Sequence, residues 1–266
     1  MGFIDWLRGK LRQRRARRIS RRPPSKTPYG FLFVGPAAMQ EGTFEKAEVD
    51  LLSSLFDNAD LFVNVGANYG FYLCHAAQKK LPCVAVEPIS ENVALLKRNL
   101  ELNGFEDLVE LNQCACGSET GEVTLFGTGT GASAVEGWAR NPKALNETVP
   151  VRRLDDILKG RSVSERTVIL CDVEGFELEV LKGASATLGA ASKPVWLLES
   201  GLSNPSAPDD LSDKFLAVFD LLTEHGYEMF PMRALDRPIQ RDLIVKSLQD
   251  RTDLIQEDNF LVRARS

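Results

Sequence analysis

Short runs in which nearly every residue is apolar are the clearest signal along the chain. They occur at 61–65, 83–87, 168–172 and 195–199, and a further strand is predicted at the more mixed segment 109–115. Runs of this length, closed by glycine or by a polar residue, predict buried strands. Two weaker extended segments, 122–126 and 149–154, predict a hairpin beside the main sheet.

Between these runs, apolar residues recur with the spacing of one helix face. The helices predicted in this way lie at 44–57, 69–79, 178–188 and 210–225. A helix that follows 83–87 is expected to take Ser90 as its N-cap and to stop at Gly104. Strands that alternate with helices indicate a parallel sheet with helices on both faces.

The end of the chain adds two strands, at 227–230 and 260–263. No helix of clear period separates them, so an antiparallel edge strand is expected. The predicted fold class is therefore α/β, with a mostly parallel seven-stranded sheet. Residues 1–30 are predicted to form a basic N-terminal arm or linker, and residues 31–266 a single domain.

The segment 64–70 links a predicted strand to a predicted helix and carries the first candidate chemistry. Gly66 allows a tight turn and close approach of a ligand to the backbone. The N-terminus of the next helix suits a carboxylate or a phosphate. By itself, such a turn is explained equally well by close packing.

Glu87 makes a ligand site the better interpretation. It ends the next strand, 21 residues after Gly66, where an acid can accept hydrogen bonds from both ribose hydroxyls. Dinucleotides and S-adenosylmethionine both fit this arrangement. Asn68 replaces the middle glycine that a dinucleotide site uses to approach a pyrophosphate, which favours S-adenosylmethionine.

The sequence resembles the FkbM-type methyltransferase family over roughly residues 58–200. The resemblance rests on six ordered blocks: FVNVGANYG at 62–70, VEP at 86–88, NLELNG at 99–104, LDDIL at 154–158, DVEGFE at 172–177 and VLKGA at 180–184. It implies a class I methyltransferase, Rossmann-like fold and transfer of a methyl group to a hydroxyl oxygen. The implied acceptor is a small molecule or glycan, with the reacting hydroxyl on a sugar, glycolipid or natural product.

The resemblance also implies roles for individual residues. The turn would hold the methionine end of the cofactor, Glu87 the ribose, and Ala115 would approach the adenine. The full set of candidate cofactor-binding residues is Asn64, Gly66, Ala67, Asn68, Gly70, Glu87, Pro88, Ala115 and Asp172.

Two positions depart from the family pattern. Asn64 stands where the family usually has aspartate, so a contact with the cofactor ammonium would lose charge assistance. Leu170 stands where a lysine usually precedes the DVEG block, which affects the acceptor side.

Three carboxylates are candidates for the catalytic base: Asp172, Glu174 and Glu199. Asp172 and Glu199 fall at the carboxyl ends of adjacent predicted strands, where open α/β sheets bind ligands. We expect Asp172 or Glu174 to be the base and Glu199 to shape the acceptor pocket. Glu174 could instead cap the following helix. No metal is expected, although these acids could hold magnesium.

Charge is distributed unevenly between the arm and the rest of the chain. Residues 1–26 contain ten basic side chains and one acid, and the remaining residues contain 22 basic and 36 acidic side chains. An acidic body makes nucleic-acid binding unexpected. The arm also carries Trp6 among its arginines, so it could lie on an anionic membrane surface or be a solvated tail.

The five cysteines have no CxxC pair and read as small buried side chains in a reducing compartment. A cytoplasmic enzyme is expected, in contact with a membrane at most through the arm. Two other functions stay open: a nicotinamide-dependent oxidoreductase and a non-catalytic binding module with the same fold.

Overall fold

A computed structural model describes residues 18–127, 129–135, 138, 146–204 and 207–265. The predicted arm, with the proposed membrane contact at 1–26, lies mostly outside the described residues. No helix in the described ranges is long and apolar enough to cross a membrane.

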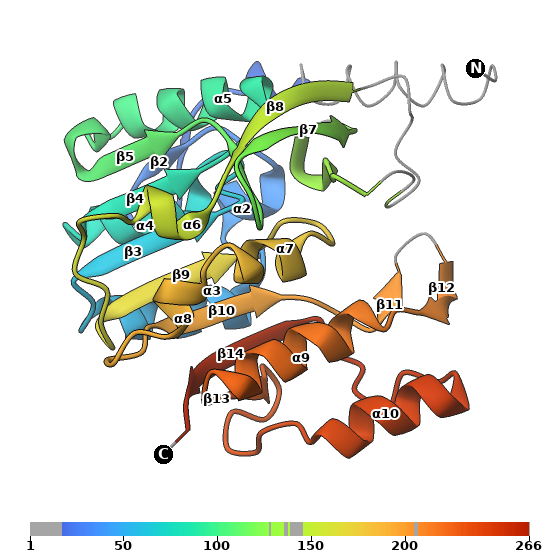
Figure 1. The fold of residues 1–266 in the computed structure, drawn as a ribbon. Helices are drawn as coiled ribbons and strands as arrows, with labels where there is room; N and C mark the ends of the chain where they lie inside the picture. The colour runs from blue at the N-terminus through green and yellow to red at the C-terminus, as the bar shows by residue number, and fades with distance from the viewer. Residues whose placement is uncertain (1–17, 128, 136–137, 139–145, 205–206, 266) are drawn as a thin grey trace, which may run out of the picture.

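A seven-stranded sheet forms the centre of the molecule, in the order β13-β14-β10-β9-β3-β4-β5 (Figure 1). Its strands are β3 (Leu61–Val65), β4 (Cys83–Val86), β5 (Val109–Asn112), β9 (Thr167–Cys171), β10 (Val195–Glu199), β13 (Tyr227–Pro231) and β14 (Asn259–Ala264). All seven were predicted from the sequence. β3, β4, β5, β9 and β10 are parallel to one another.

The edge of the sheet is antiparallel, as the sequence predicted, because the edge strand β13 pairs in antiparallel fashion with β14. β14 pairs in antiparallel fashion with both β10 and β13, so it lies second from the edge. The helix α10 (Arg241–Asp250), which was not predicted, lies between β13 and β14 in the chain. Among its apolar residues only Ile244 is buried, which explains why its periodic signal is weak.

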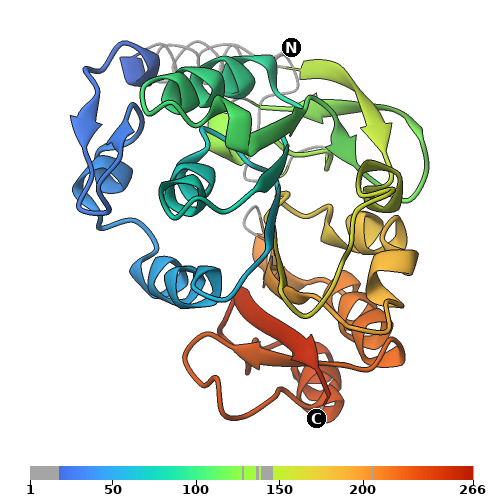
Figure 2. The ribbon, with the colours of Figure 1, turned by 90° about the vertical axis from the view of Figure 1, so that its left-hand side faces the viewer.

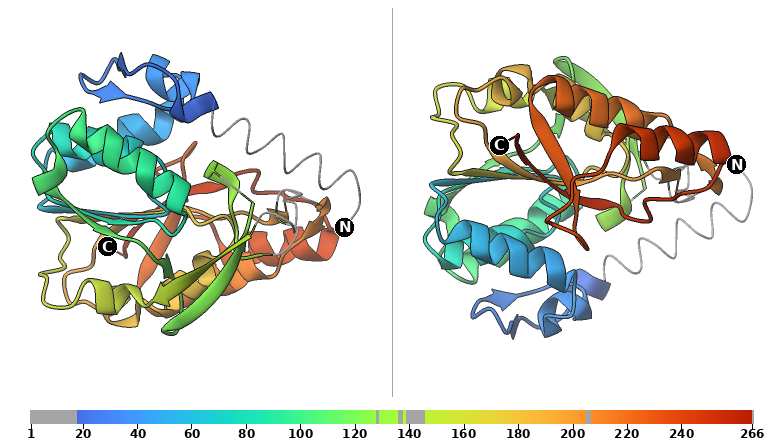
Figure 3. Two further views of the ribbon diagram at one scale, coloured as in Figure 1. Left: turned by 90° about the horizontal axis from the view of Figure 1, so that it is seen from above. Right: turned by 90° about the horizontal axis from the view of Figure 1, so that it is seen from below.

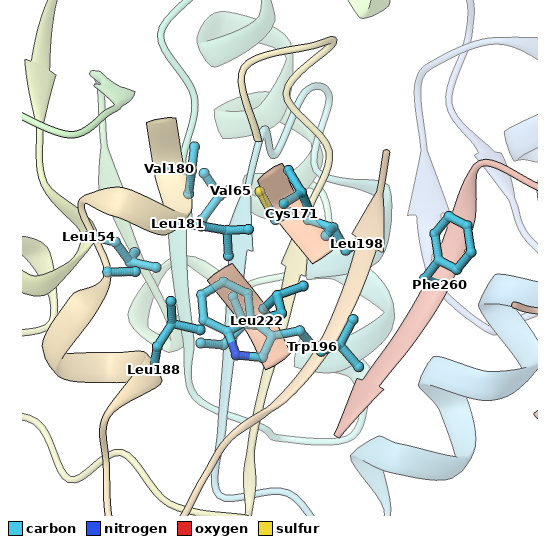
Figure 4. Close-up of a cluster of buried hydrophobic side chains, with 14 of the residues drawn as sticks. Val65, Leu154, Cys171, Val180, Leu181, Leu188, Trp196, Leu198, Leu222 and Phe260 are labelled. Atoms are coloured by element: carbon cyan, nitrogen blue, oxygen red, sulfur yellow. The ribbon is translucent and has the colours of Figure 1, made fainter. Parts of the chain in front are cut away.

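Helices cover both faces of the sheet (Figure 3). One face is covered by α3 (Lys46–Phe56), α4 (Phe71–Gln78) and α5 (Ser90–Glu101). The other is covered by α6 (Leu154–Ile157), α7 (Glu177–Lys182), α8 (Ser185–Leu188) and α9 (Lys214–Glu224). Successive residues of each central strand face opposite layers, so Val63 lies in the core on the α6–α9 face and its neighbour Phe62 packs against Phe56 of α3. Trp196 is fully buried in the core on the α6–α9 face (Figure 4).

Three predicted elements have different boundaries. Ile89, not Ser90, is the N-cap of α5, and the Ser90 hydroxyl instead donates to Glu147. The helix predicted over 178–188 is divided into α7 and α8. At the break, a side chain on Gly183 would overlap the carbonyl oxygen of Gly117. The first part of the helix predicted at 210–225 is the end of strand β12 (Ala207–Leu211), which pairs with β11 (Ser203–Asn204).

A second, small sheet lies beside the main one. Its strands are β6 (Ala115–Cys116), β7 (Gly121–Phe126) and β8 (Asn146–Arg152). The antiparallel pairing of β7 with β8 confirms the predicted hairpin. The strand predicted over 109–115 is broken, because β5 ends at Asn112 and the chain then joins this second sheet. Short 3-10 turns occur at η1 (Glu106–Leu108) and η2 (Gly129–Gly131).

Residues before the main sheet pack on the outside of α5 (Figure 2). The strands β1 (Ser25–Lys26) and β2 (Leu32–Phe33) form a hairpin, and α2 (Ala37–Glu41) follows. Asn99 on α5 and Asn103, two residues after its end, each exchange two hydrogen bonds with the backbone, at Val34 and Leu32 respectively. These side chains fix the described N-terminal segment to the domain.

Candidate active site

The turn between β3 and α4 is held against two neighbouring strands. The N–H groups of Gly66 and Ala67 both donate to the carbonyl of Val86, at 2.9 and 3.0 Å. Gly66 has φ +84°, and a side chain there would overlap the carbonyl oxygen of Asp172. Glycine is therefore required at this position both by conformation and by space.

Glu87 closes this turn from the end of β4. Its Oε2 accepts the Asn68 N–H at 2.7 Å, and its Oε1 accepts the Ile89 N–H at 2.9 Å and the Asn92 side chain at 3.1 Å. Burial raises the pKa of Glu87 to about 7, although these donors act in the opposite direction. The turn at 66–68 and the carboxylate at 87 thus converge, as the sequence predicted.

Both features line one cleft, which we call the first cleft. Its lining also includes Pro88 and Ala115 of the predicted set, Asp172 and Glu174. The Oδ1 atoms of Asn68, Asn92 and Asp172 are buried and accept no hydrogen bond from a described residue. A ligand that donates hydrogen bonds would satisfy these three acceptors.

Three predicted cofactor residues are not part of this lining. Asn64 is buried within β3, Ala67 is buried in the turn, and Gly70 packs against Leu96 as the N-cap of α4. The backbone N–H groups of Asn68 and Gly70 already donate to Glu87 and to the Ala67 carbonyl. The turn therefore offers fewer free N–H groups than the sequence suggested.

Asp172 and Glu199 lie at the carboxyl ends of the adjacent strands β9 and β10, as predicted. Burial raises the pKa of Asp172 well above its ordinary range, and the charges of Glu199 and Glu174 raise it further. Burial raises the pKa of Glu199 to about 7, while its hydrogen bond with Asp172 acts in the opposite direction. The two carboxyl groups share a hydrogen bond, so they titrate as one pair that retains a proton near neutrality.

Glu174 does not cap the following helix, which was the alternative prediction for it. Its backbone has φ +54°, and its Oε2 accepts the indole N–H of Trp138 at 2.7 Å. Its carbonyl accepts the Ser133 hydroxyl at 2.6 Å. No described side chain caps α7; Glu177, its first residue, accepts the Gly175 N–H with its Oε1 at 2.9 Å.

A larger second cleft, of about 630 Å³, adjoins the first. This volume lies within the range of about 300–1,000 Å³ that is typical of small-molecule sites. Glu199 lines the second cleft only, Asp172 lines the first only, and Glu174 lines both. The hydrogen-bonded carboxyl pair consequently connects the two clefts.

Several residues of the site carried no signal in the sequence. Glu45 precedes α3 in a left-handed conformation, accepts the Tyr72 hydroxyl at 2.5 Å, and its charge raises the pKa of Asp172 and Glu199. Asn92 and Trp138 orient the carboxylates of Glu87 and Glu174. Asn92 lies on the predicted helix five residues after Glu87, so its helical position was its only clue.

The sheet order, the single antiparallel strand beside the edge, and a cleft formed by a glycine turn and an acid on the next strand define a class I S-adenosylmethionine-dependent methyltransferase. The chain belongs to the FkbM methyltransferase family, whose model, described as Methyltransferase FkbM domain, matches residues 64–229. This assignment decides in favour of S-adenosylmethionine over a nicotinamide cofactor.

No curated protein matches the sequence significantly. Among solved structures, a SAM-dependent methyltransferase from Agrobacterium tumefaciens is 12% identical, with a TM-score of 0.46 over 91% of this chain and 69% of that one. A ribosomal protein L11 methylase from Lactobacillus delbrueckii subsp. bulgaricus is 10% identical, with a TM-score of 0.43 over 82% and 79%. A precorrin-6y C5,15-methyltransferase from Geobacter metallireducens is 13% identical, with a TM-score of 0.40 over 69% and 72%. These similarities do not bear on the acceptor.

The two departures from the family pattern adjoin each other. Asn64 on β3 and Leu170 on β9 are paired in the register of the sheet, and both are buried. An aspartate and a lysine at these positions would lie side by side, whereas this chain has neutral residues at both. Replacing the two together avoids leaving one charge buried without its partner.

Proposed function

We propose that the enzyme methylates a hydroxyl oxygen of a sugar, glycolipid or natural product, at the junction of the two clefts. The observation that carries this proposal is the Asp172–Glu199 pair, with one carboxyl group lining each cleft. A hydroxyl is a poor nucleophile until its proton is removed, so O-methylation benefits from a base at this junction.

The first cleft is the proposed cofactor site. S-adenosylmethionine supplies a methyl group that is activated by a positively charged sulfur. Its ammonium and its ribose hydroxyls are donors, which suits Glu87 and the buried Oδ1 atoms of Asn68, Asn92 and Asp172. The cleft has a volume of about 60 Å³, and Gly129, Ala132 and Ala134 are part of its lining.

The acceptor lies in the second cleft in this proposal. Its hydroxyl proton passes to the Asp172–Glu199 pair as the oxygen takes the methyl group. Asp172 is the proposed base, and Glu199 acts by setting its pKa. Glu174 is held by Trp138 and acts on the pair through its charge. The protein otherwise contributes alignment, since the reaction is a direct displacement.

Transfer from S-adenosylmethionine with a ¹³C-labelled methyl group tests this function. The enzyme is incubated with metabolite and lipid extracts of its host, and NMR identifies the atom that carries the label. We expect the methyl signal of an ether oxygen. Labelling only of nitrogen or carbon would show that the proposed reaction is wrong.

Glu87→Gln should weaken S-adenosylmethionine binding by about ten- to hundredfold, because charge-assisted hydrogen bonds contribute roughly 1.5–3 kcal/mol. The substituted amide would also place a donor against the N–H groups of Asn68 or Ile89. Calorimetry measures the change, with Glu101→Gln at the exposed end of α5 as the control. Unchanged affinity would remove Glu87 from the cofactor site.

The arm is proposed to place the enzyme on an anionic membrane, which would suit a glycolipid acceptor. Residues 1–17 contain six basic side chains, and each basic residue near such a surface contributes about 1 kcal/mol. Deletion of 1–17 spares the hairpin at 25–33. It should lower binding to vesicles of phosphatidylserine and phosphatidylcholine at least tenfold in sedimentation assays. Equal binding by both forms would reject membrane contact.

A further inference from the structure

The second cleft is lined by many more acids than bases. Its described lining contains a single basic side chain, Lys214. The charge of Lys214 also acts on Glu179, which is not among the cleft residues. The acidic residues of the lining are Glu174, Glu177, Glu199, Asp213 and Asp258.

Some acids on the described surface outside this cleft are paired with a basic side chain, whereas three acids of the cleft are not. Asp50, Asp57, Asp60 and Asp220 each form an ion pair with a lysine or arginine. Glu199, Asp213 and Asp258 form none with any described residue. Burial raises the pKa of Asp258, and the charges of the neighbouring acids Asp253 and Glu257 raise it further. The excess of negative charge is thus a property of this cleft as well as of the whole acidic chain.

An ionised carboxylate only accepts hydrogen bonds, so a ligand that fits this cleft must donate them. Hydroxyl and ammonium groups donate, and an ammonium also relieves the repulsion among the carboxylates. A phosphate would add negative charge to a partly desolvated acidic site, which is unfavourable.

Trp138 adds an aromatic surface to the same cleft. Its six-membered ring packs against Gly175, where a Cβ atom would lie 2.7 Å from its Cζ3. Its N–H donates to Glu174, so the ring is fixed in orientation. An aromatic ring beside carboxylates suits a compact polar ligand with an apolar ring face, and it adds a cation–π contact for an ammonium.

We propose that the methyl acceptor is an amine-bearing polyol, such as an amino sugar, and that phosphorylated acceptors are excluded by the second cleft. This inference rests on the proposed function, because it assigns that cleft to the acceptor. The methylated atom is still a hydroxyl oxygen, and the ammonium lies against Asp213 and Asp258.

Binding of three simple probes tests the inference without requiring methyl transfer. The full chain is saturated with S-adenosylhomocysteine and titrated at neutral pH with glucosamine, glucose or glucose 6-phosphate, observed by saturation-transfer NMR. We expect glucosamine to bind about fivefold more tightly than glucose, as one water-screened charge pair would give. Glucose 6-phosphate should bind more weakly than glucose.

A double variant, Asp213→Asn with Asp258→Asn, locates the effect. It should abolish the preference for glucosamine over glucose, while Asp107→Asn at the opposite edge of the sheet should leave the preference unchanged. The inference is overturned if glucose 6-phosphate binds as well as glucosamine, if the preference survives the double variant, or if no probe binds. An O-methylated neutral acceptor would overturn the inference and leave the proposed function standing.

Discussion

Gly66→Ala should abolish S-adenosylmethionine binding and destabilise the fold by about 2–6 kcal/mol. Gly66 has φ +84°, which an alanine adopts only with strain. Its new Cβ would also overlap the carbonyl oxygen of Asp172, so either the turn or the end of β9 must move. Any such movement displaces Asn68 or Asp172 from the first cleft. Urea unfolding and calorimetry measure the two effects.

Gly160→Ala is the matched control for backbone strain. Gly160 has φ +83°, nearly the value at Gly66, but a Cβ there meets nothing within 4 Å. The cost of a left-handed residue alone is about 1–2 kcal/mol. We therefore expect Gly160→Ala to bind the cofactor normally and to lose clearly less stability than Gly66→Ala. Equal losses in the two variants would show that the contact with Asp172 has no effect.

The contact between Gly66 and the Asp172 carbonyl shows why the sequence predicts the cofactor turn better than it predicts the residues packed around that turn. A strand, a glycine turn and an acid at the end of the next strand follow local rules, so Gly66 and Glu87 could be placed from spacing alone. Parallel strands carry their carboxyl ends to one edge, which also brought Asp172 and Glu199 together in the prediction. The backbone contact between residues 66 and 172 requires the full fold and left no local pattern.

The features that were missed depend on long-range packing. Glu45 reaches the site through Tyr72, and Trp138 reaches it through Glu174, over 27 and 36 residues of chain respectively. The sequence did not predict that β14 lies between β10 and β13. Its apolar pattern suits an edge position equally well, and only its hydrogen bonds with both strands fix its place. The side chain of Glu174 was ambiguous for the same reason, because its partner lies on another segment.

Asp172→Asn should lower kcat by about 10²–10⁴-fold, the usual contribution of a positioned base. A neutral amide cannot take the proton of the hydroxyl, whereas the methyl donor and the first cleft remain in place. Single-turnover methyl transfer to the acceptor identified with the ¹³C label measures the loss. Glu122→Gln, an exposed acid on β7 outside both clefts, is the control.

The substitution should not unfold the protein. Burial raises the pKa of Glu199 from an ordinary 4.5 to about 7, and it raises the pKa of Asp172 as well. Ionisation of such groups is less favourable in the folded state, so they destabilise the fold increasingly as pH rises between these values. Asparagine at 172 removes that cost, and stability at neutral pH should be equal or higher. A large fall in stability would leave kcat unable to report on the base, and Asp172→Glu would then be compared.

The pH profile of the Glu199→Gln variant distinguishes the catalytic base, Asp172, from the neighbouring carboxylate, Glu199. In the unmodified enzyme, kcat/KM should rise with pH through about 7, because the pair must lose its proton to act as base. The groups that face Glu199 are Asp172, Glu174, Glu45 and Glu177, and all are acids. Removing the charge of Glu199 lowers the pKa of Asp172, so the rise should move to lower pH while substantial activity remains. Loss of activity in Glu199→Gln, with full turnover in Asp172→Asn, would make Glu199 the base.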